Sequence, residues 1–332
     1  MTTSKHTNSE TEPDTPPDAA GVATSALPPA MPRTAAVADR IETFAVVDST
    51  NVRARHLLSE GALGALEELS PQNGEEPMIV VAADLQRSGH GRLGRFWFGR
   101  PGDSFMVSFA TALPRALATD PGVNGWVQMA AGIAAIDALR DALGECGAST
   151  SGESAPFQLK WPNDIFCDGH KLGGILCELV PLGKHGAAAD SADSADVADA
   201  DDLVGVVVGV GINLRVPADR LPTAQSTSLQ LHYPGLAPTG PLRDDIAAAM
   251  VTSLRESLHR LCEAPREQME QLHTRVLEES YTLGRRVEVK LADGGIIRGE
   301  ALSVNADASL TVRDAEGATH VVSTGDVGVL PV

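Results

Sequence analysis

The dipeptide Asp168-Gly169 separates two short apolar segments, residues 165–167 and 172–179. An Asp-Gly pair between apolar segments strongly indicates a β-hairpin, because these residue types accept the positive φ angles of a tight turn between twisted strands. A third apolar segment, residues 157–161, lies just before the pair. The sequence therefore predicts adjacent strands here, and the rest of the chain must fold around the sheet that they form.

Further strands and helices are expected on both sides of this hairpin. Apolar runs predict strands at residues 41–47, 78–83 and 203–214. Residues 124–145 place apolar side chains at helical spacing, which predicts a long, half-buried helix over one face of the sheet. Residues 242–276 are expected to be helical, with an apolar stripe along one side.

Composition divides the chain into three parts. Residues 1–40 are rich in Thr, Pro, Ala and Ser without periodicity, which is typical of a disordered tail. Residues 41–278 form the main domain, interrupted by an acidic low-complexity loop at residues 184–202. Residues 279–332 contain short strand patterns separated by Gly and Asp turns, which predict a small β-barrel.

The net charge limits the possible ligands and compartments. The chain carries a formal charge of −18 in 332 residues, which argues against general affinity for nucleic acid. Its longest apolar stretch, residues 203–214, is shorter than a membrane span. No secretory signal pattern starts the sequence, and the four cysteines show neither a CxxC pair nor zinc spacing, so a cytoplasmic location with free thiols is expected.

One segment suits an anionic ligand in spite of the acidic composition. Residues 85–100 contain four arginines, one histidine and no acidic residue, and residues 89–94 match the pattern GxGxxG. A dinucleotide-binding fingerprint would open a helix, whereas aromatics, glycines and a proline follow here and favour loop and strand. The chain also has no GxxxxGK[ST] sequence and no kinase HRD or DFG sequence. The remaining interpretations are an anion-binding glycine loop and a plain surface turn.

Two motifs decide between them. The sequence KWPND at residues 160–164 is followed by KLGGIL at residues 171–176. Together with DSTN at 48–51, the loop at 86–97 and GVGIN at 209–213, they resemble the biotin protein ligase family in sequence, order and spacing. The resemblance covers roughly residues 41–275 and is to the monofunctional form without a DNA-binding domain.

The resemblance implies an α+β fold: a mixed, largely antiparallel sheet flanked by helices, as in class II synthetases, plus a C-terminal SH3-like β-barrel. It implies an enzyme that forms biotinyl-5′-AMP from biotin and ATP and then biotinylates a lysine. Mg²⁺ is expected to arrive with ATP, with no dedicated metal site and no tightly bound prosthetic group. The expected partner is the biotin carboxyl carrier domain of an acyl-CoA or pyruvate carboxylase, with no DNA or membrane partner, and the chain is expected to be a monomer or homodimer.

Site residues follow from the same resemblance. Positions that match the family's biotin-binding residues are Ser49, Thr50, Asn51, Gln86, His90, Gly91, Arg92, Lys171 and Gly174. Positions that match its ATP-binding and adenylate-binding residues are Arg92, Arg95, Trp97, Asn163 and Asn213. The expected catalytic residues are Lys171, Arg92 and Asp164, of which Lys171 offsets the charge of the reacting carboxylate and phosphate.

Several alternatives stay open from the residues alone. Ser49 and Thr50 also suit a simple helix cap. Asp164, expected to orient or deprotonate the acceptor lysine, equally suits a turn that accepts backbone hydrogen bonds. His90 and Leu93 stand where many family members have arginine, which bears on how firmly the loop retains the adenylate. A lipoate or octanoate ligase and a biotin-sensing module without turnover are the alternative functions.

Overall fold

The computed structural model describes five segments of the chain, residues 25–67, 77–97, 99–145, 156–182 and 203–330. Its centre is a seven-stranded sheet with the order β1-β2-β5-β9-β8-β7-β6, in which only β1 and β2 are parallel neighbours. The predicted mixed, largely antiparallel sheet is therefore confirmed. Its strands are β1 (Arg40–Val47), β2 (Ile79–Gln86), β5 (Ser104–Pro114), β6 (Phe157–Lys160), β7 (Asp164–Cys167), β8 (His170–Val180) and β9 (Leu203–Asn213).

The predicted hairpin joins β7 to β8. Asp168 and Gly169 both have positive φ angles, 49° and 73°, which is the left-handed conformation that a two-residue turn requires. β8 then pairs along almost its whole length with β9. The pairing of β7 with β8 has one register shift, between Ile165 and Phe166, and the predicted hairpin is confirmed.

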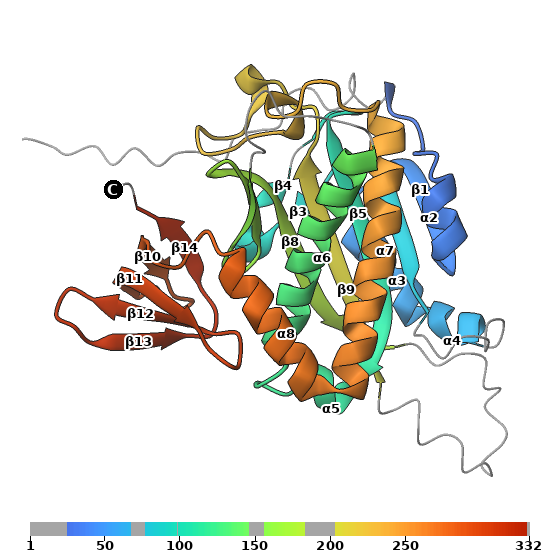
Figure 1. The fold of residues 1–332 in the computed structure, drawn as a ribbon. Helices are drawn as coiled ribbons and strands as arrows, with labels where there is room; N and C mark the ends of the chain where they lie inside the picture. Colours follow the sequence, from blue (N-terminus) through green and yellow to red (C-terminus); the bar gives the residue numbers. More distant parts are fainter. Residues whose placement is uncertain (1–24, 68–76, 98, 146–155, 183–202, 331–332) are drawn as a thin grey trace, which may run out of the picture.

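Helices cover both faces of the sheet because its side chains alternate between two hydrophobic clusters. On β2, Val80 and Ala82 pack toward α6 and α7, whereas Ile79 and Val81 pack toward α3 and α4. Figure 1 shows α6 and α7 lying side by side across the near face, with α8 crossing below them. The helices are α2 (Pro32–Val37), α3 (Thr50–Ser59), α4 (Ala62–Glu67), α5 (Arg115–Ala118), α6 (Asn124–Glu145), α7 (Thr239–Glu263) and α8 (Pro265–Glu278), with short 3-10 turns at η2 (Arg92–Gly94), η5 (Ala218–Arg220) and η6 (Leu229–Leu231).

Two helical expectations need correction. Residues 242–276 are helical as predicted except at Ala264, where the chain turns between α7 and α8 because Pro265 cannot continue a helix. The prediction of a disordered tail at residues 1–40 is wrong at residues 32–37, which form α2. Residues 1–24 of the predicted tail lie outside the described part of the chain. The first backbone N–H groups of α2, on Arg33 and Thr34, donate to the Asp244 carboxylate of α7 at 2.9 and 2.8 Å. A cap supplied from such a distant residue leaves no local sequence signal.

The C-terminal part forms a second, antiparallel sheet with the order β13-β12-β11-β10-β14, as expected for an SH3-like barrel. Its strands are β10 (Arg286–Lys290), β11 (Ile296–Val304), β12 (Leu310–Asp314), β13 (Thr319–Val322) and β14 (Asp326–Val329). The strand patterns of the sequence at residues 286–291, 296–304, 310–313 and 320–322 predicted the first four strands closely, and no pattern predicted β14. The predicted domain boundary at residues 278/279 stays a prediction.

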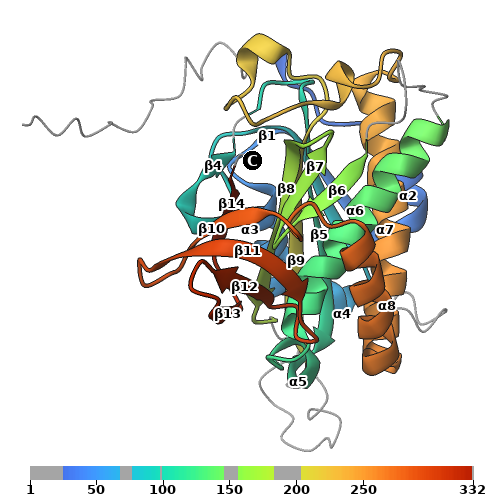
Figure 2. The same cartoon turned by 60° about the vertical axis from the view of Figure 1, so that its left-hand side comes forward.

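Two tryptophans join the C-terminal sheet to the main body. Trp126 on α6 and Trp161 after β6 are both buried, and their indole N–H groups donate to the carbonyls of Ala306 and Ala308 at 2.8 Å. The buried side chains of the C-terminal sheet and those on the α6 and α7 face of the main sheet belong to one continuous hydrophobic cluster. Because these contacts are buried and hydrogen-bonded, the C-terminal sheet holds a fixed position beside β8 and α8 (Figure 2).

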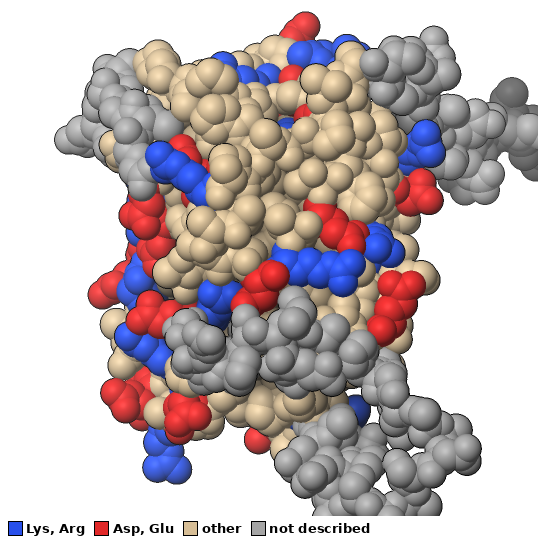
Figure 3. Space-filling view, turned by 90° about the vertical axis from the view of Figure 1, so that its right-hand side faces the viewer, with Lys and Arg blue, Asp and Glu red and all other residues tan. Residues whose placement is uncertain are grey.

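Charged side chains are spread over the surface. On the face shown in Figure 3, Lys and Arg side chains lie among Asp and Glu side chains and do not gather in a broad basic field. No helix in the described part of the chain combines the length and apolar character needed to cross a bilayer. Among the described cysteines, Cys167 and Cys177 form no disulfide, and burial raises the pKa of both thiols to about 12.

Candidate active site

A cavity of about 750 Å³ lies over the α3 side of the seven-stranded sheet. Its floor comes from β8 and β9, its walls from the start of α3 and the glycine loop at residues 89–97, and its far side from the C-terminal sheet. This volume suits a ligand of nucleotide size. The cavity brings together every site residue expected from the sequence: Ser49, Thr50, Asn51, Gln86, His90, Gly91, Arg92, Arg95, Trp97, Asn163, Asp164, Lys171, Gly174 and Asn213.

The end of the cavity beside α3 is held by a buried hydrogen-bond network. The Ser108 hydroxyl on β5 lies 2.7 Å from Thr50 Oγ1 and 2.6 Å from Asn51 Oδ1, and it donates its one hydrogen to one of these two oxygens at a time. The Gln86 side-chain oxygen accepts from the Thr50 backbone N–H at 2.8 Å, and Asn51 Nδ2 donates to Glu178 at 2.7 Å. Buried polar groups that are all satisfied hold one geometry, so this wall is preformed. Ser108 itself was not predicted from the sequence.

The N-cap interpretation of Ser49 is also confirmed. Its side chain accepts from the Val52 backbone N–H at the start of α3. Ser49 and Thr50 nevertheless line the cavity. One short segment therefore both starts a helix and forms a pocket wall.

Two glycines on β9 make room for pocket side chains. A Cβ atom at Gly209 would lie 2.0 Å from the Asn51 side-chain oxygen, and one at Gly211 would lie 2.6 Å from the Trp97 ring. Any larger residue at either position would displace its neighbour, since both distances are far below van der Waals contact. The GVGIN sequence thus has a steric explanation.

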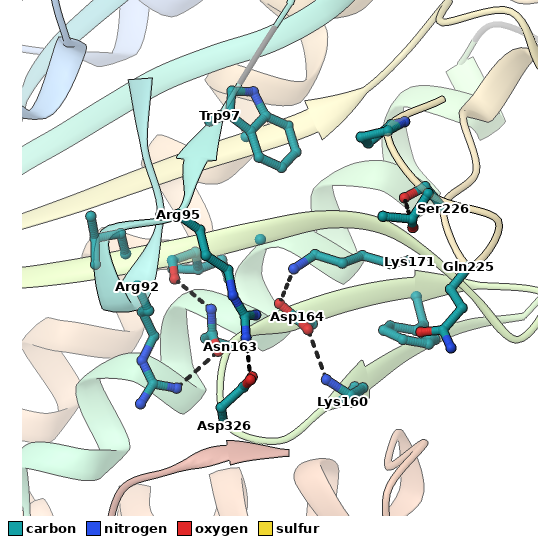
Figure 4. Close-up of a pocket in the computed structure, with 18 of the residues that line it drawn as sticks. Arg92, Arg95, Trp97, Lys160, Asn163, Asp164, Lys171, Gln225, Ser226 and Asp326 are labelled. Carbon is teal, nitrogen blue, oxygen red and sulfur yellow. Dashed lines mark hydrogen bonds and ion pairs between the residues drawn. The ribbon is translucent and has the colours of Figure 1, made fainter. Parts of the chain in front are cut away.

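Three charged groups meet at the turn between β6 and β7. The Asp164 carboxylate accepts from Lys160 Nζ at 2.9 Å and from Lys171 Nζ at 2.6 Å (Figure 4). Burial opposes ionisation of Asp164, but the charges and hydrogen bonds of the two lysines outweigh it and hold its pKa below the usual carboxyl value. Within the described segments, the Asp164 carboxylate accepts its hydrogen bonds from lysine side chains, so the geometry does not match the alternative of a turn that accepts backbone hydrogen bonds.

The glycine loop presents its two predicted phosphate-binding arginines to the cavity. Its ends pair as β3 (Gly89–His90) and β4 (Phe96–Trp97), with the 3-10 turn η2 between them, so no helix follows the GxGxxG pattern. Arg92 donates to the Asn163 side-chain oxygen at 3.0 Å and to Thr324 Oγ1 at 3.0 Å. Arg95 forms an ion pair with Asp326 (Figure 4). The other two arginines of the segment, Arg87 and Arg100, do not line the cavity.

Trp97 lies against Gly211 of β9, and Asn213 is the last residue of that strand. Within the described segments, no hydrogen-bond partner faces the buried indole N–H of Trp97. The Asn213 side-chain amide donates to the Thr227 carbonyl at 2.9 Å and so ties β9 to the loop that follows it. Trp161, in contrast, is buried under the C-terminal sheet and does not line the cavity.

Comparisons with known proteins agree with this geometry. The model of the biotin/lipoate A/B protein ligase family matches residues 44–188. The biotin–[acetyl-CoA-carboxylase] ligase of Mycobacterium tuberculosis is 29% identical over 289 residues, which span 87% of this chain and 88% of that protein. The resemblance to biotin protein ligases is confirmed. The bifunctional ligase/repressor BirA of Bacillus subtilis is 24% identical, over 82% of this chain and 74% of its own length.

The fold agrees with a solved biotin protein ligase as well. The Aquifex aeolicus biotin protein ligase in complex with biotin and ATP superposes with a TM-score of 0.55 at 20% identity, covering 88% of this chain and 98% of that one. The segment matched by the family model contains the glycine loop and the Lys160–Asp164–Lys171 group, and it ends before β9.

Several cavity residues were missed by the sequence-based predictions. Lys160 could have been found, since it belongs to the KWPND motif and the chain has only five lysines. Tyr281, Arg285 and Asp326 line the cavity from beyond β9, where no motif marks them. The segment after α8 brings Tyr281 to the site, because its backbone N–H donates to the Leu159 carbonyl and its ring stacks on Phe166. Arg285 lies over the Tyr281 ring, and the docking of the C-terminal sheet brings Asp326.

The described residues contain no group of three or more His, Cys, Asp or Glu side chains arranged to hold a metal ion. The cavity carboxylates, Asp164 and Asp326, are each engaged by cations of the protein.

Proposed function

We propose that the protein is an ATP-dependent biotin protein ligase, which forms biotinyl-5′-adenylate and transfers biotin to a lysine of a carrier domain. The observation that carries this proposal is the convergence of the glycine-loop arginines, Lys171 and the α3 wall on one cavity. The relatives named as biotin ligases and the family match support the same reaction.

In the first half-reaction, a biotin carboxylate oxygen attacks the α-phosphorus of MgATP. A new carboxyl–phosphate bond forms, the bond from the α-phosphorus to the bridging oxygen breaks, and pyrophosphate leaves. Two anions must approach each other, so a fixed cation lowers the barrier. We assign this role to Lys171, whose ammonium group Asp164 holds at 2.6 Å. Mg²⁺ enters with ATP as part of the substrate.

The two ends of the cavity suit the two parts of the adenylate. We assign the biotin end to the wall at the start of α3 and the strand positions beside it, with these residues: Ser49, Thr50, Asn51, Gln86, His90, Gly91 and Gly174. We assign the nucleotide end to the glycine loop and β9, where Arg92 and Arg95 face phosphates and Trp97, Asn163 and Asn213 lie near the nucleoside.

In the second half-reaction, the neutral amine of the carrier lysine attacks the acyl carbon of the mixed anhydride. The amide bond forms, the bond from the acyl carbon to the phosphate oxygen breaks, AMP leaves, and the amine passes its proton to solvent. A carboxylate with a lowered pKa and two ammonium partners is a weak proton acceptor. We therefore assign Asp164 a positioning role: it orients Lys171 in the first half-reaction. In the second half-reaction, after Lys171 has turned toward the phosphate, Asp164 orients the carrier lysine.

The proposed partner is the biotin carboxyl carrier domain of an acyl-CoA or pyruvate carboxylase, and the protein acts as a monomer or homodimer. We propose the cytoplasm as its compartment, since Cys167 and Cys177 form no disulfide.

Exchange of labelled pyrophosphate into ATP tests the first half-reaction. Purified protein is incubated with ATP and biotin, lipoate or octanoate in parallel. We expect exchange with biotin alone. Exchange only with lipoate or octanoate would move the protein to the sister activity of the same family. Biotin binding without any exchange would instead favour a sensing module.

A further inference from the structure

We infer that Asp326 of the C-terminal sheet is a built-in competitor of ATP for Arg95, so that this sheet sets the nucleotide affinity of the site. The inference rests on the proposed function and adds a positioning residue that the glycine-loop motif does not contain.

The geometry places the C-terminal sheet against both phosphate-binding arginines. Asp326, at the start of β14, forms an ion pair with Arg95, and Thr324 accepts a hydrogen bond from Arg92 at 3.0 Å. Figure 4 shows Arg95 extending from the glycine loop toward Asp326. The two arginines expected to bind phosphate are therefore both in contact with the C-terminal sheet.

Asp326 is held firmly at this position. The adjacent Val327 is 3% exposed and packs in the core of the C-terminal sheet. β14 pairs with β10 from Val287 to Lys290. The buried contacts of Trp126 and Trp161 fix that sheet to the main body. The carboxylate thus stands at a fixed point at the edge of the cavity.

The Arg95–Asp326 pair is exchangeable. The Arg95 side chain is 58% exposed and that of Asp326 is 23% exposed, and ion pairs this accessible to water contribute little stability. A triphosphate presents several charges and bidentate acceptors to a guanidinium group, so it outcompetes a single carboxylate. Asp326 then remains near the bound phosphates as an uncompensated negative charge, which lowers the affinity for ATP.

The test compares Asp326→Asn with the wild type. Removing the charge of Asp326 should lower the KM for ATP in biotin-dependent pyrophosphate exchange about threefold, as expected for a partly exposed pair. The KM for biotin should stay unchanged. The difference should shrink at 1 M salt, because exposed charges are screened. A raised or unchanged KM for ATP would overturn the inference.

Two controls make the result specific. Glu300→Gln removes a carboxylate that pairs with Arg313 on the same sheet and does not line the cavity, so it should leave the KM for ATP unchanged. In an Arg95→Gln background, Asp326→Asn should have a smaller effect than in the wild type, because the competition for Arg95 is gone and only the repulsion between Asp326 and the phosphates is left. An effect as large as in the wild type would overturn the role of Arg95 in the inference. If Asp326→Asn does not fold, Asp326→Ser serves as the second variant with the same expectation.

Calorimetric titration with ATP alone separates this inference from the proposed function. It measures nucleotide affinity without turnover, so Asp326→Asn should bind ATP about threefold more tightly even if no acid supports exchange. Failure of biotin-dependent exchange in the wild type would reject the proposed function. Equal ATP affinity of the two proteins would reject the role of Asp326.

Discussion

The two sides of the cavity hold their charges in opposite ways. On the sheet side, Asp164 is buried between Lys160 and Lys171, at 2.9 and 2.6 Å, and strands hold all three residues. On the loop side, Arg95 is largely exposed and contacts an aspartate from a separate sheet. The buried group is costly to disturb and suits a fixed catalytic charge. The exposed pair exchanges partners easily and suits a ligand that must enter and leave.

The largest effect is expected on the sheet side, from removal of the proposed catalytic cation. Lys171→Ala should reduce biotin-dependent pyrophosphate exchange by a factor on the order of 10² to 10³, the usual effect of removing a group that stabilises transition-state charge. The fold should persist, since Lys160 still pairs with Asp164. Circular dichroism provides the control for folding. Unchanged turnover would remove Lys171 from the mechanism. It would also contradict the claim that the sheet side of the cavity holds a fixed catalytic charge.

The buried carboxylate should be important for stability. Asp164→Asn leaves two ammonium groups without their shared partner and should lower the free energy of unfolding by about 3 kcal/mol at pH 7. Because the folded pKa of Asp164 lies below the unfolded value, its stabilisation is complete above about pH 4 and is lost as the pH falls through the folded pKa.

Urea unfolding at several pH values measures this contribution. The wild type and Asp164→Asn should differ most at neutral pH and converge in acid, where the carboxyl is protonated. A difference that stays constant down to pH 2 would show that the charge of Asp164 is not the cause.

A steric change on the floor of the cavity should weaken biotin binding. Gly209→Ala places a methyl group 2.0 Å from the Asn51 oxygen and should displace that side chain from its hydrogen bonds with Ser108 and Glu178. We expect at least about a tenfold loss of biotin affinity in calorimetry. Gly144→Ala on α6, where an added Cβ meets nothing within 4 Å, is the matched control and should bind biotin normally.

The smallest effect is expected on the loop side. Asp326→Asn should change the free energy of unfolding by less than about 1 kcal/mol, and 1 M salt should abolish the change. The same urea measurement on Asp164→Asn should be almost insensitive to salt, because a buried group is poorly screened. Equal sensitivity of the two variants would remove the distinction between the two sides.

Much of this architecture could be predicted from the sequence because its signals are local. The Asp168-Gly169 pair predicted one hairpin, and the apolar spacing of residues 124–145 predicted α6 with the ends that the structure shows. The site residues of the catalytic part came from short motifs in the glycine loop and around Asp164, and all of them line the cavity.

Features that depend on tertiary contacts could not be predicted in this way. The cap of α2 comes from Asp244, more than two hundred residues away, so the composition of the segment suggested a tail. Ser108 and Asp326 belong to no motif, and only the pairing of β5 with β9 and the docking of β14 bring them to the site. The departures at His90 and Leu93 lie on the exposed part of the loop and line the cavity, and their effect on adenylate retention stays a prediction.

The complete reaction is the most direct test of the proposed function. Purified protein, biotin and MgATP are mixed with a biotin carboxyl carrier domain, and the mass of the carrier is followed by mass spectrometry. We expect the mass to rise by one biotinyl group on a single lysine, only when ATP is present. An unchanged carrier mass, with a carrier that a known biotin protein ligase can modify, would contradict the account.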